Sequence, residues 1–445
     1  MPTNAPFTST IEQNAQREYI TETAVEYQNE ADLYSLLEDA PAEMINAKGL
    51  KQPLEKYPNA SLSIPNIDGG ATPTIGTRQL SYMQITYAPI AQGSGETYEA
   101  VLNNNKETAE DELMRNIKSD AKQQVFNINS YVSRGNGTAG LATTSAAYSG
   151  GSPTVAVVNG TTDTIGASQL FPGQWCTFWS STGATARVAT NAGPFQIASR
   201  SATSITFTGS LPTDYGSGDI IAPEVGTTDA TTSLKGLPYI IDNANTYFGK
   251  DRAVDTYLQS YVLGSAGSLT AGMLATTYFN IQQRGGYGFG PSTELIDQLW
   301  MIMGVTQKSN YYNLSLNSGA VVGSPNYYVT QGNDKPKLDL GMKGFEFTWF
   351  NAPIYTANSV RGDEIYYANK KYLRRAVLKN IGAMPGTMPQ SGNIWLVNSS
   401  GVPIYTRARF QDWIGQMYSQ SPYKLGKISG ITVTNLPQAR NTMWQ

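Results

Sequence analysis

Few residues of this chain have the types and spacing that catalysis needs. Histidine does not occur among its 445 residues, which removes the commonest general base, the commonest zinc ligand and every serine–histidine or cysteine–histidine nucleophile. The only cysteine, Cys176, lies in an aromatic, strand-like run with no basic neighbour that would lower the pKa of its thiol. We therefore expect a buried structural cysteine, and a single cysteine also rules out an internal disulfide.

Paired carboxylates are the remaining arrangement that could catalyse a reaction without histidine or cysteine, since a glycosidase needs only two carboxylic side chains. The candidate clusters are Asp363-Glu364, after a turn glycine, and the acidic run 110–112 at the start of a predicted helix. We interpret both as solvated charged faces, the second because acidic residues complement the helix dipole. The glycine-rich run 284–290 matches neither phosphate-binding nor dinucleotide-binding spacing, which indicates a loop. The sequence thus predicts no catalytic residue, no cofactor and no metal site.

Length and charge narrow the class of protein. The chain exceeds the size that one hydrophobic core reaches, so we expect two or more lobes. Lysine and arginine number 31 against 34 acidic residues, and the net charge of −3 creates no global attraction to nucleic acid or to an anionic membrane. The N-terminus lacks a secretion signal and no apolar run could span a bilayer, so we expect a soluble protein made in the cytoplasm. The 27 tyrosines suit partly solvated interfaces.

The first hundred residues predict extensions rather than a core. Residues 1–55 form an arm in which a capping-box signal starts a short helix that Pro41 ends. Its apolar stripe must dock on the rest of the chain or on a neighbour. The stripe consists of Leu33, Leu36 and Leu37. Alternation over 80–87, within 58–100, then predicts strands around turns, which together make an extended two-stranded excursion.

A long helix and an all-β module are predicted next. Apolar residues repeat at helical spacing from Asn105 to Ser133, a length on the order of 40 Å at about 1.5 Å per residue. Since only one face is apolar, this helix should lie across a sheet or a larger body. Residues 150–225 predict a compact all-β module of short strand-like runs. These runs are Thr154–Val158, Gln174–Trp179, Ala186–Thr190, Ser204–Thr208 and Asp219–Ala222.

The remaining residues predict two helices and then sheet strands. Ser268–Gln283 and Pro291–Met303 have helical periodicity, the second with proline in its first turn. Short β-like segments follow them along the chain. They are Phe345–Phe350, Tyr355–Ala357, Ile365–Tyr367, Ile394–Val397 and Ile428–Val433.

Three segments carry a family resemblance. Residues 133–141 (SRGNGTAGL) look like the glycine-rich exit from a spine helix. Residues 235–242 (KGLPYIID) look like the entry to a lobe that follows an inserted module, and 360–373 (VRGDEIYYANKKYL) like the stretch after a central strand. With the order of arm, extended loop, long helix, mixed lobe and late strand, they resemble the capsid fold of tailed bacteriophages. This fold, called the Hong Kong ninety-seven fold, is shared with encapsulins and the herpesvirus shell floor.

The resemblance implies an α+β fold with an N-terminal arm, an extended loop, a spine helix, peripheral and axial domains and an inserted small all-β domain. The implied divisions are 1–55 for the arm, 56–103 for the extended loop, 104–149 for the peripheral domain with the spine helix, 150–228 for the inserted β domain, 229–340 for the axial domain, 341–395 for the return strands of the peripheral domain and 396–445 for the C-terminal part of both domains.

The implied function is structural, without catalysis. Such a major capsid protein assembles as pentamers and hexamers into the icosahedral head shell around phage DNA, in the host cytoplasm, and stays in the virion. Implied partners are further copies of the chain, portal and scaffold proteins, a decoration protein and packaged double-stranded DNA, with no membrane. Implied contacts between subunits are Leu33, Leu36, Leu37, Leu80, Tyr82, Ile85, Tyr87, Tyr287 and Phe289. The alternatives are a β-rich phage or surface adhesin or fibre, and a carboxylate-pair glycosidase.

Two departures from the family give expectations. Only about 55 residues precede the loop, so we expect a separate scaffold protein. Some members of the family weld the shell through an isopeptide bond from a lysine in the overlapping loop, but no lysine occurs here between Lys56 and Lys106. We therefore predict no such cross-link: boiled particles should run on a denaturing gel as one band of monomer. A ladder of covalent oligomers would contradict this.

Overall fold

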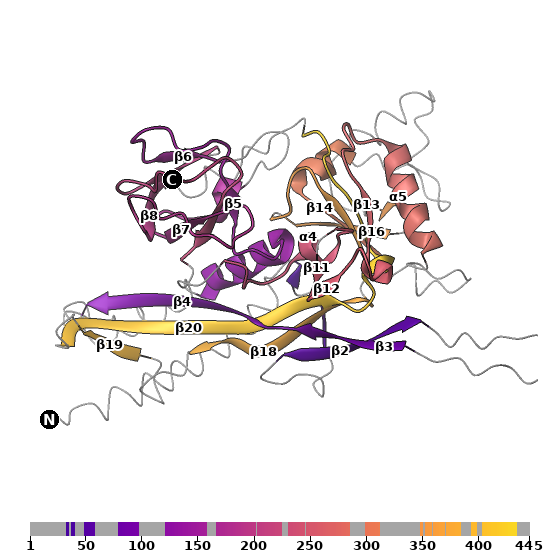
Figure 1. Cartoon of the computed structure of the whole chain (residues 1–445), viewed down its shortest axis with the longest axis horizontal. Coiled ribbons are helices and arrows are strands. Elements are labelled where there is room, and N and C mark those ends of the chain that lie inside the picture. The colour runs from indigo at the N-terminus through magenta and orange to yellow at the C-terminus, as the bar shows by residue number, and fades with distance from the viewer. Residues whose placement is uncertain are drawn as a thin grey trace, which may run out of the picture.

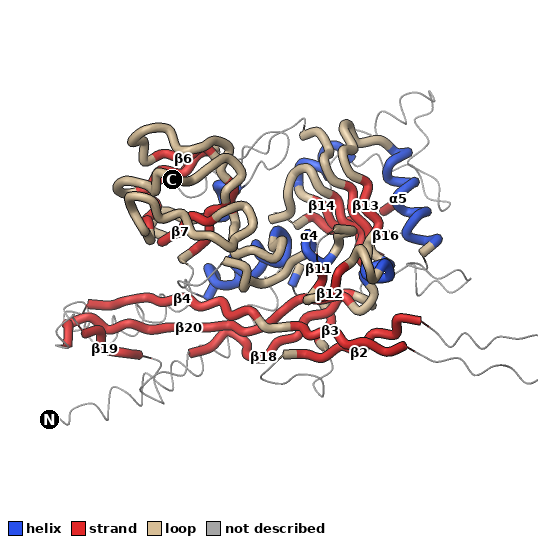
Figure 2. The backbone as a smooth tube through the Cα atoms, viewed as in Figure 1, coloured by secondary structure: helices blue, strands red, loops and turns tan. Residues whose placement is uncertain are grey.

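A layer of long strands underlies two lobes in the computed structural model of the chain (Figure 1). Strands make up the layer and the centres of both lobes, and the longer helices lie beside the sheets (Figure 2). The residues that the structure describes are 33–34, 37–40, 49–57, 79–97, 121–157, 166–201, 203–224, 230–244, 246–284, 299–311, 348–349, 352–357, 359–369, 371–383, 393–397 and 403–433.

The underlying layer, here called the base sheet, has one long strand at its centre. β20 (Pro403–Ser419) pairs along one edge with β4 (Ala88–Thr97) and along the other with β18 (Leu373–Ala383) and β19 (Asn393–Val397). At about 3.3 Å per residue, β20 spans roughly 55 Å. β1 (Glu38–Asp39) adds a short parallel strand to the outer edge of β18. Two register shifts interrupt β18 in its middle.

A hairpin leaves the base sheet as a separate two-stranded sheet. β2 (Leu50–Tyr57) pairs antiparallel with β3 (Gln79–Ile85), and only residues 86–87 separate β3 from β4. Successive side chains of a strand point to opposite faces. One face of β3 therefore buries Met83 and Ile85, while Tyr82 on the other face is 64% exposed.

The first lobe is an antiparallel sheet of six short strands in the order β5-β10-β7-β8-β9-β6. A helix over 121–134 precedes it and a 3-10 turn, Gly166–Gln169, lies within it. Its interior is aromatic: Phe178 stacks on Tyr215 and packs against Phe195 and Phe207. The strands are β5 (Ala142–Thr143), β6 (Thr154–Ala156), β7 (Trp175–Trp179), β8 (Phe195–Arg200), β9 (Ser204–Phe207) and β10 (Ile220–Pro223).

The second lobe is a mixed sheet in the order β13-β21-β17-β14-β16-β15. Beside it lie α4 (Leu237–Ile240), α5 (Ala271–Gln283), a helix over 305–311 and the small hairpin of β11 (Thr246–Tyr247) and β12 (Lys250–Asp251). Two 3-10 turns, Thr256–Leu258 and Pro422–Lys424, pack on each other. The strands are β13 (Tyr261–Leu263), β14 (Leu299–Met303), β15 (Thr348–Trp349), β16 (Ala352–Thr356), β17 (Ile365–Asn369) and β21 (Gly426–Ile428).

Both faces of the central strand β14 are buried, and this overturns the helix predicted at 291–303. Trp300 and Ile302 belong to the main core, whereas Met301 and Met303 belong to a second core that also contains residues of α5. A run that is apolar on both sides has no strand alternation to reveal it. Residues 291–298 lie outside the described residues.

Several other predicted elements can be compared with the structure. The helix predicted at 268–283 is confirmed as α5, whose N-cap Thr270 accepts a hydrogen bond from the Met273 amide at 3.3 Å. Strand predictions matching β6, β7, β9, β10, β17 and β19 are also confirmed. The run 186–190 makes only an isolated bridge at Ala186, and β8 was not predicted. Of the long helix, residues 121–134 are helical and 105–120 lie outside the described residues.

Three predicted segments differ from the structure. The arm helix was expected to reach Pro41, but Glu38–Asp39 forms β1 because the edge of β18 offers backbone partners. The late strand at 345–350 is confirmed only as Thr348–Trp349, and the long strand of the fold is β20 instead. The segment 428–433 contributes the end of β21 and a bridge at Ile431.

The crossing of the 121–134 helix with the start of α4 leaves no room for a side chain at Gly236. A Cβ there would overlap the carbonyl oxygen of Tyr131 and lie 2.5 Å from that of Val132. We predict that Gly236→Ala lowers the free energy of unfolding by on the order of 2 kcal/mol. The thermal unfolding midpoint should therefore fall by several degrees. Gly264→Ala is the matched control, because a Cβ at Gly264 meets nothing within 4 Å. Equal midpoints for both variants would contradict the prediction.

Candidate assembly interface

Three of the predicted contact residues are buried inside the subunit itself. Leu33 is 1% exposed, Leu37 is 3% exposed and Ile85 is 0% exposed, and all three belong to the main core. Their side chains therefore offer no surface to a neighbouring copy, and the prediction is corrected for them. The physical reason is that the main core of the same subunit supplies the apolar partners that the sequence left unassigned.

Among the described residues of the predicted contact set, Tyr82 is exposed, and it lies on the outward face of the hairpin. Tyr82 pairs across the strands with the exposed Pro53, and Lys51 and Gln84 form the next exposed pair on that face. Tyr87 is partly buried and packs on the main core. Leu80 occupies a strand position opposite Glu55. Leu36, Tyr287 and Phe289 lie outside the described residues.

The arm is fixed to the base sheet by a charged clamp. The Arg375 guanidinium lies 4.6 Å from the ring centroid of Tyr34 and donates to the Tyr34 carbonyl at 2.9 Å. It also pairs with Asp39 at 2.5 Å. The Tyr34 ring packs edge-on against Trp413 of β20, with centroids 5.8 Å apart. The described part of the arm is thus attached to its own subunit and not to a neighbouring copy.

The hairpin is held by apolar packing at its root and by one polar bond farther along its strands. Leu50, Leu54 and Met83 are buried in the main core. Lys250 of β12 donates from Nζ to the Ser81 hydroxyl at 2.8 Å. Beyond this root the outward face of the hairpin remains exposed, which gives the subunit a projecting element with an aromatic side chain.

The acidic pair Asp363-Glu364 is not a solvated face, and that interpretation is corrected. Asp363 is 4% exposed and Glu364 is 7% exposed. Arg361 pairs with Asp363 at 3.2 Å, and the Tyr366 hydroxyl donates to Glu364. Burial raises the pKa of Asp363 to about 6, although Arg361 opposes that shift. Both carboxylates are enclosed by their own chain, so they are structural groups.

Cys176 has the structural role that the sequence predicted. It is 0% exposed, and burial raises the pKa of its thiol to about 12. The described parts of the chain contain no group of three or more histidine, cysteine or acidic residues arranged to hold a metal ion. None of the described helices is long and apolar enough to cross a bilayer.

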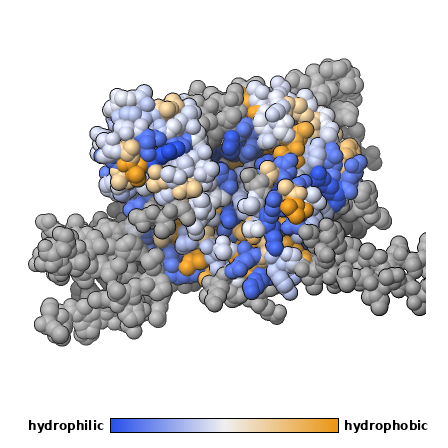
Figure 3. Space-filling view, in the orientation of Figure 1, coloured by the Kyte–Doolittle hydropathy of each residue, from blue (hydrophilic) through white to orange (hydrophobic). Residues whose placement is uncertain are grey.

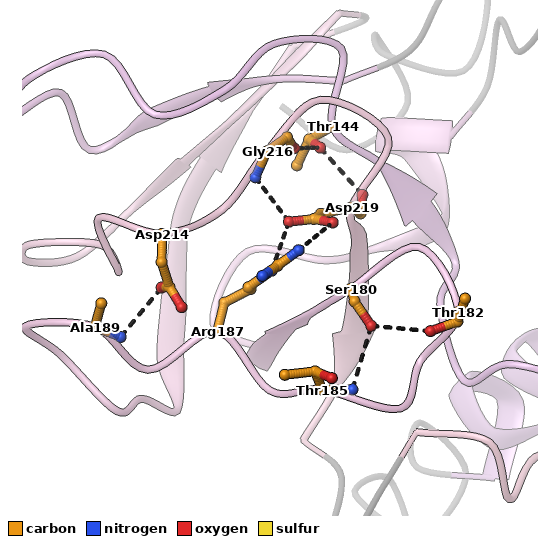
Figure 4. A network of polar contacts seen from close by, with 9 residues as sticks. All are labelled: Thr144, Ser180, Thr182, Thr185, Arg187, Ala189, Asp214, Gly216 and Asp219. Atoms are coloured by element: carbon orange, nitrogen blue, oxygen red, sulfur yellow. Dashed lines mark hydrogen bonds and ion pairs between the residues drawn. The ribbon is translucent and has the colours of Figure 1, made fainter.

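The first lobe keeps its loops in place with a polar network (Figure 4). Arg187 donates to both carboxylate oxygens of Asp219, at 2.8 and 3.1 Å, and Asp219 also accepts from the Gly216 amide at 2.7 Å. The hydrogen bond to Asp219 is the main cause that raises the pKa of Arg187. Thr144 donates to the Gly216 carbonyl at 2.6 Å. These groups satisfy one another, which indicates a structural network.

Two exposed apolar side chains on this lobe were not predicted as a site. Trp175 is 47% exposed and Val188 is 50% exposed. Trp175 shares a face of β7 with Trp179, whose bridge partner is Ala186, two residues before Val188. The alternation of side chains along the predicted strand 174–179 was the sequence signal that could have identified Trp175 as an exposed residue. On the face in Figure 3, apolar residues form small separate patches among polar ones.

No protein-family model and no curated protein matches the sequence. Among solved structures, the chain is similar to one from the capsid asymmetric unit of cyanophage A-1(L), with a TM-score of 0.48, 13% identity and coverage of 91% of this chain and 93% of the other. A chain from the capsid of an empty GTA particle gives 0.40 at 7% identity, covering 90% and 89%. A chain of an encapsulin complex from Synechococcus elongatus gives 0.39 at 8% identity, covering 91% and 89%.

The buried Asp363 makes stability depend on pH. Its folded pKa of about 6 lies above the ordinary value, so the folded chain holds this proton more tightly than the unfolded chain does. Stability should therefore fall as the pH rises from about 4 to about 6. We predict that Asp363→Asn, which stays neutral, removes this fall and gains on the order of 2 kcal/mol relative to the natural chain at neutral pH.

Thermal unfolding midpoints across that pH range would measure the effect. The control is Glu224→Gln, because Glu224 is exposed. The thermal unfolding midpoint of this variant should follow that of the natural chain at every pH. A constant difference between Asp363→Asn and the natural chain at all pH values would contradict the assignment.

Proposed function

We propose that this chain is the major capsid protein of a tailed bacteriophage, a structural subunit that assembles as pentamers and hexamers into the icosahedral head shell. The observation that carries the proposal is the shape of the subunit. Both lobes stand on one side of the base sheet, and the hairpin of β2 and β3 projects from it (Figure 1). A flat tile with a projecting element can cover an area and overlap its neighbours.

The sequence resemblance supplies the names of the parts, but two of the bounds it implied change. The strands β15, β16 and β17, expected in the peripheral domain, lie in the sheet of the second lobe, and β4, expected in the extended loop, pairs in the base sheet. In the proposed subunit the base sheet and the 121–134 helix belong to the peripheral domain, and the second lobe is the axial domain near the centre of a capsomer. The first lobe is the inserted β domain, and the hairpin is the root of the extended loop. Portal, scaffold and decoration proteins and packaged DNA are the proposed partners, and the host cytoplasm is the proposed place of assembly.

The hairpin face with Tyr82 is the proposed contact between subunits. An aromatic side chain that is 64% exposed in the single subunit can bury a large area against a neighbour. The energy of protein interfaces concentrates in a few such residues. The folded subunit does not use this side chain in its cores, so its contribution to assembly can be separated from its contribution to folding.

Micrographs of particles purified after expression with the other phage head proteins test the proposal. Closed shells of uniform size are expected from the natural chain. Elongated fibres would favour an adhesin, and dispersed single subunits under every condition would overturn the shell function.

A substitution at Tyr82 tests the contact. We predict that Tyr82→Ser raises the protein concentration needed for shell formation by roughly tenfold or more, while the thermal midpoint of the subunit stays within a few degrees. Val254→Ser is the matched control, since Val254 is 65% exposed and lies outside the hairpin. Normal assembly of Tyr82→Ser, or an equal defect in Val254→Ser, would remove the hairpin face from the interface.

A further inference from the structure

A buried amide on the central strand joins three segments of the chain. Gln416 of β20 is 2% exposed. Its Nε2 donates to the carbonyl of Thr86 at 3.2 Å and to that of Ser233 at 3.4 Å. Its Oε1 accepts from the amides of Lys235 at 2.7 Å and Met417 at 3.1 Å. Both donor hydrogens and both lone pairs of the side chain are therefore used.

The first of these segments is the joint of the hairpin. Thr86 is one of the two residues between β3 and β4, so the hairpin turns relative to the base sheet at this point. On the other strand, Gly49 has φ +117°, and a Cβ there would overlap the carbonyl oxygen of Ile85. The two strands thus touch at the root, and Thr86 is the position at which a change of angle would be absorbed.

The second segment is the connector that follows the first lobe. Residues 233–236 run from that lobe toward α4, and the Gly236 amide donates to the Gly135 carbonyl at 2.8 Å. Lys235 is fixed further, because its Nζ lies 4.8 Å from the ring centroid of Tyr239 and 4.9 Å from that of Phe248. The connector is therefore attached to the end of the 121–134 helix and is a firm anchor for Gln416.

We propose that Gln416 is a positioning residue that sets the angle at which the hairpin leaves the base sheet. The apolar side chains at the root pack into the main core and hold the hairpin close. The hydrophobic effect itself is non-directional, so apolar packing restrains the exit angle less sharply than hydrogen bonds do. Hydrogen bonds require aligned partners, and those of Gln416 tie the joint at Thr86 to a fixed connector. The hydrogen bond from Lys250 to Ser81 steadies the hairpin farther out but does not reach the joint.

The consequence for a shell rests on the proposed function. If neighbouring tiles overlap through the hairpin, its exit angle sets the angle between subunits and hence the curvature of the shell. The positioning role itself concerns the single subunit and is tested there.

Spin-label distance measurements on the unassembled full-length chain test the role. Labels at Lys51→Cys on the hairpin and Asn380→Cys on β18 report the angle, since both positions are exposed. The natural Cys176 is fully buried and stays unlabelled. In the background of the natural Gln416 we expect one narrow distance distribution. With Gln416→Leu the population at displaced distances should rise by roughly tenfold.

Two further variants complete the design. Gln411→Leu is the matched control, because Gln411 lies on the same strand, is 4% exposed and pairs with β4 rather than with the joint. Its distribution should stay narrow. Gln416→Glu has nearly the same size and keeps an acceptor for the Lys235 amide, but it replaces the two donor hydrogens by an oxygen that faces the carbonyls of Thr86 and Ser233. It should therefore also broaden the distribution, without the change of shape that leucine brings.

Unchanged distributions in both Gln416 variants, or equal broadening in Gln411→Leu, would overturn the positioning role. Electron microscopy separates this result from the proposed function. If Gln416→Glu formed shells of mixed curvature while the natural chain formed uniform shells, the result would support both the positioning role of Gln416 and the shell function. A natural chain that never forms shells would refute the shell function while leaving the distance result intact.

Discussion

The structure depends on hydrogen bonding along both edges of β20. A strand of 17 residues exposes many backbone donors and acceptors, and each needs a partner when it is buried. β4 satisfies one edge, while β18 and β19 share the other. Three parts of the subunit connect to this strand: the hairpin leads into β4, the arm joins through β18, and the Tyr247 hydroxyl of the second lobe donates to the Ser419 carbonyl at 2.9 Å.

The sequence predicted those elements whose own residues determine them. α5 has a helical period and a capping threonine, and the strands of the first lobe alternate and are separated by turn residues. β14 was mistaken for a helix because both its faces are buried and its short apolar run has no period. β20 went unpredicted because its mixed polar and apolar residues are stabilised by pairing with segments far away in the sequence, which no local pattern records.

The same limit explains the candidate interface. Alternation identified which side chains of the arm and of β3 are apolar, but it could not tell whether their partner belongs to the same chain or to another. Leu33, Leu37 and Ile85 are buried in the main core of their own subunit, and the same alternation leaves Tyr82 outward. The acidic pair at 363–364 was misjudged because its burial arises only in the folded second lobe, although its polar partners Arg361 and Tyr366 are close in sequence.

The register shifts in β18 have a consequence for the free subunit. Among the described residues only β1 pairs with the outer edge of β18, and it covers no more than Arg374 and Arg375. A long, regular open edge can recruit strands of other molecules, but the shifts around Lys379, whose ammonium pairs with Asp412, break the even spacing of donors and acceptors. This irregular part of β18 is therefore a poor template for a strand from another molecule.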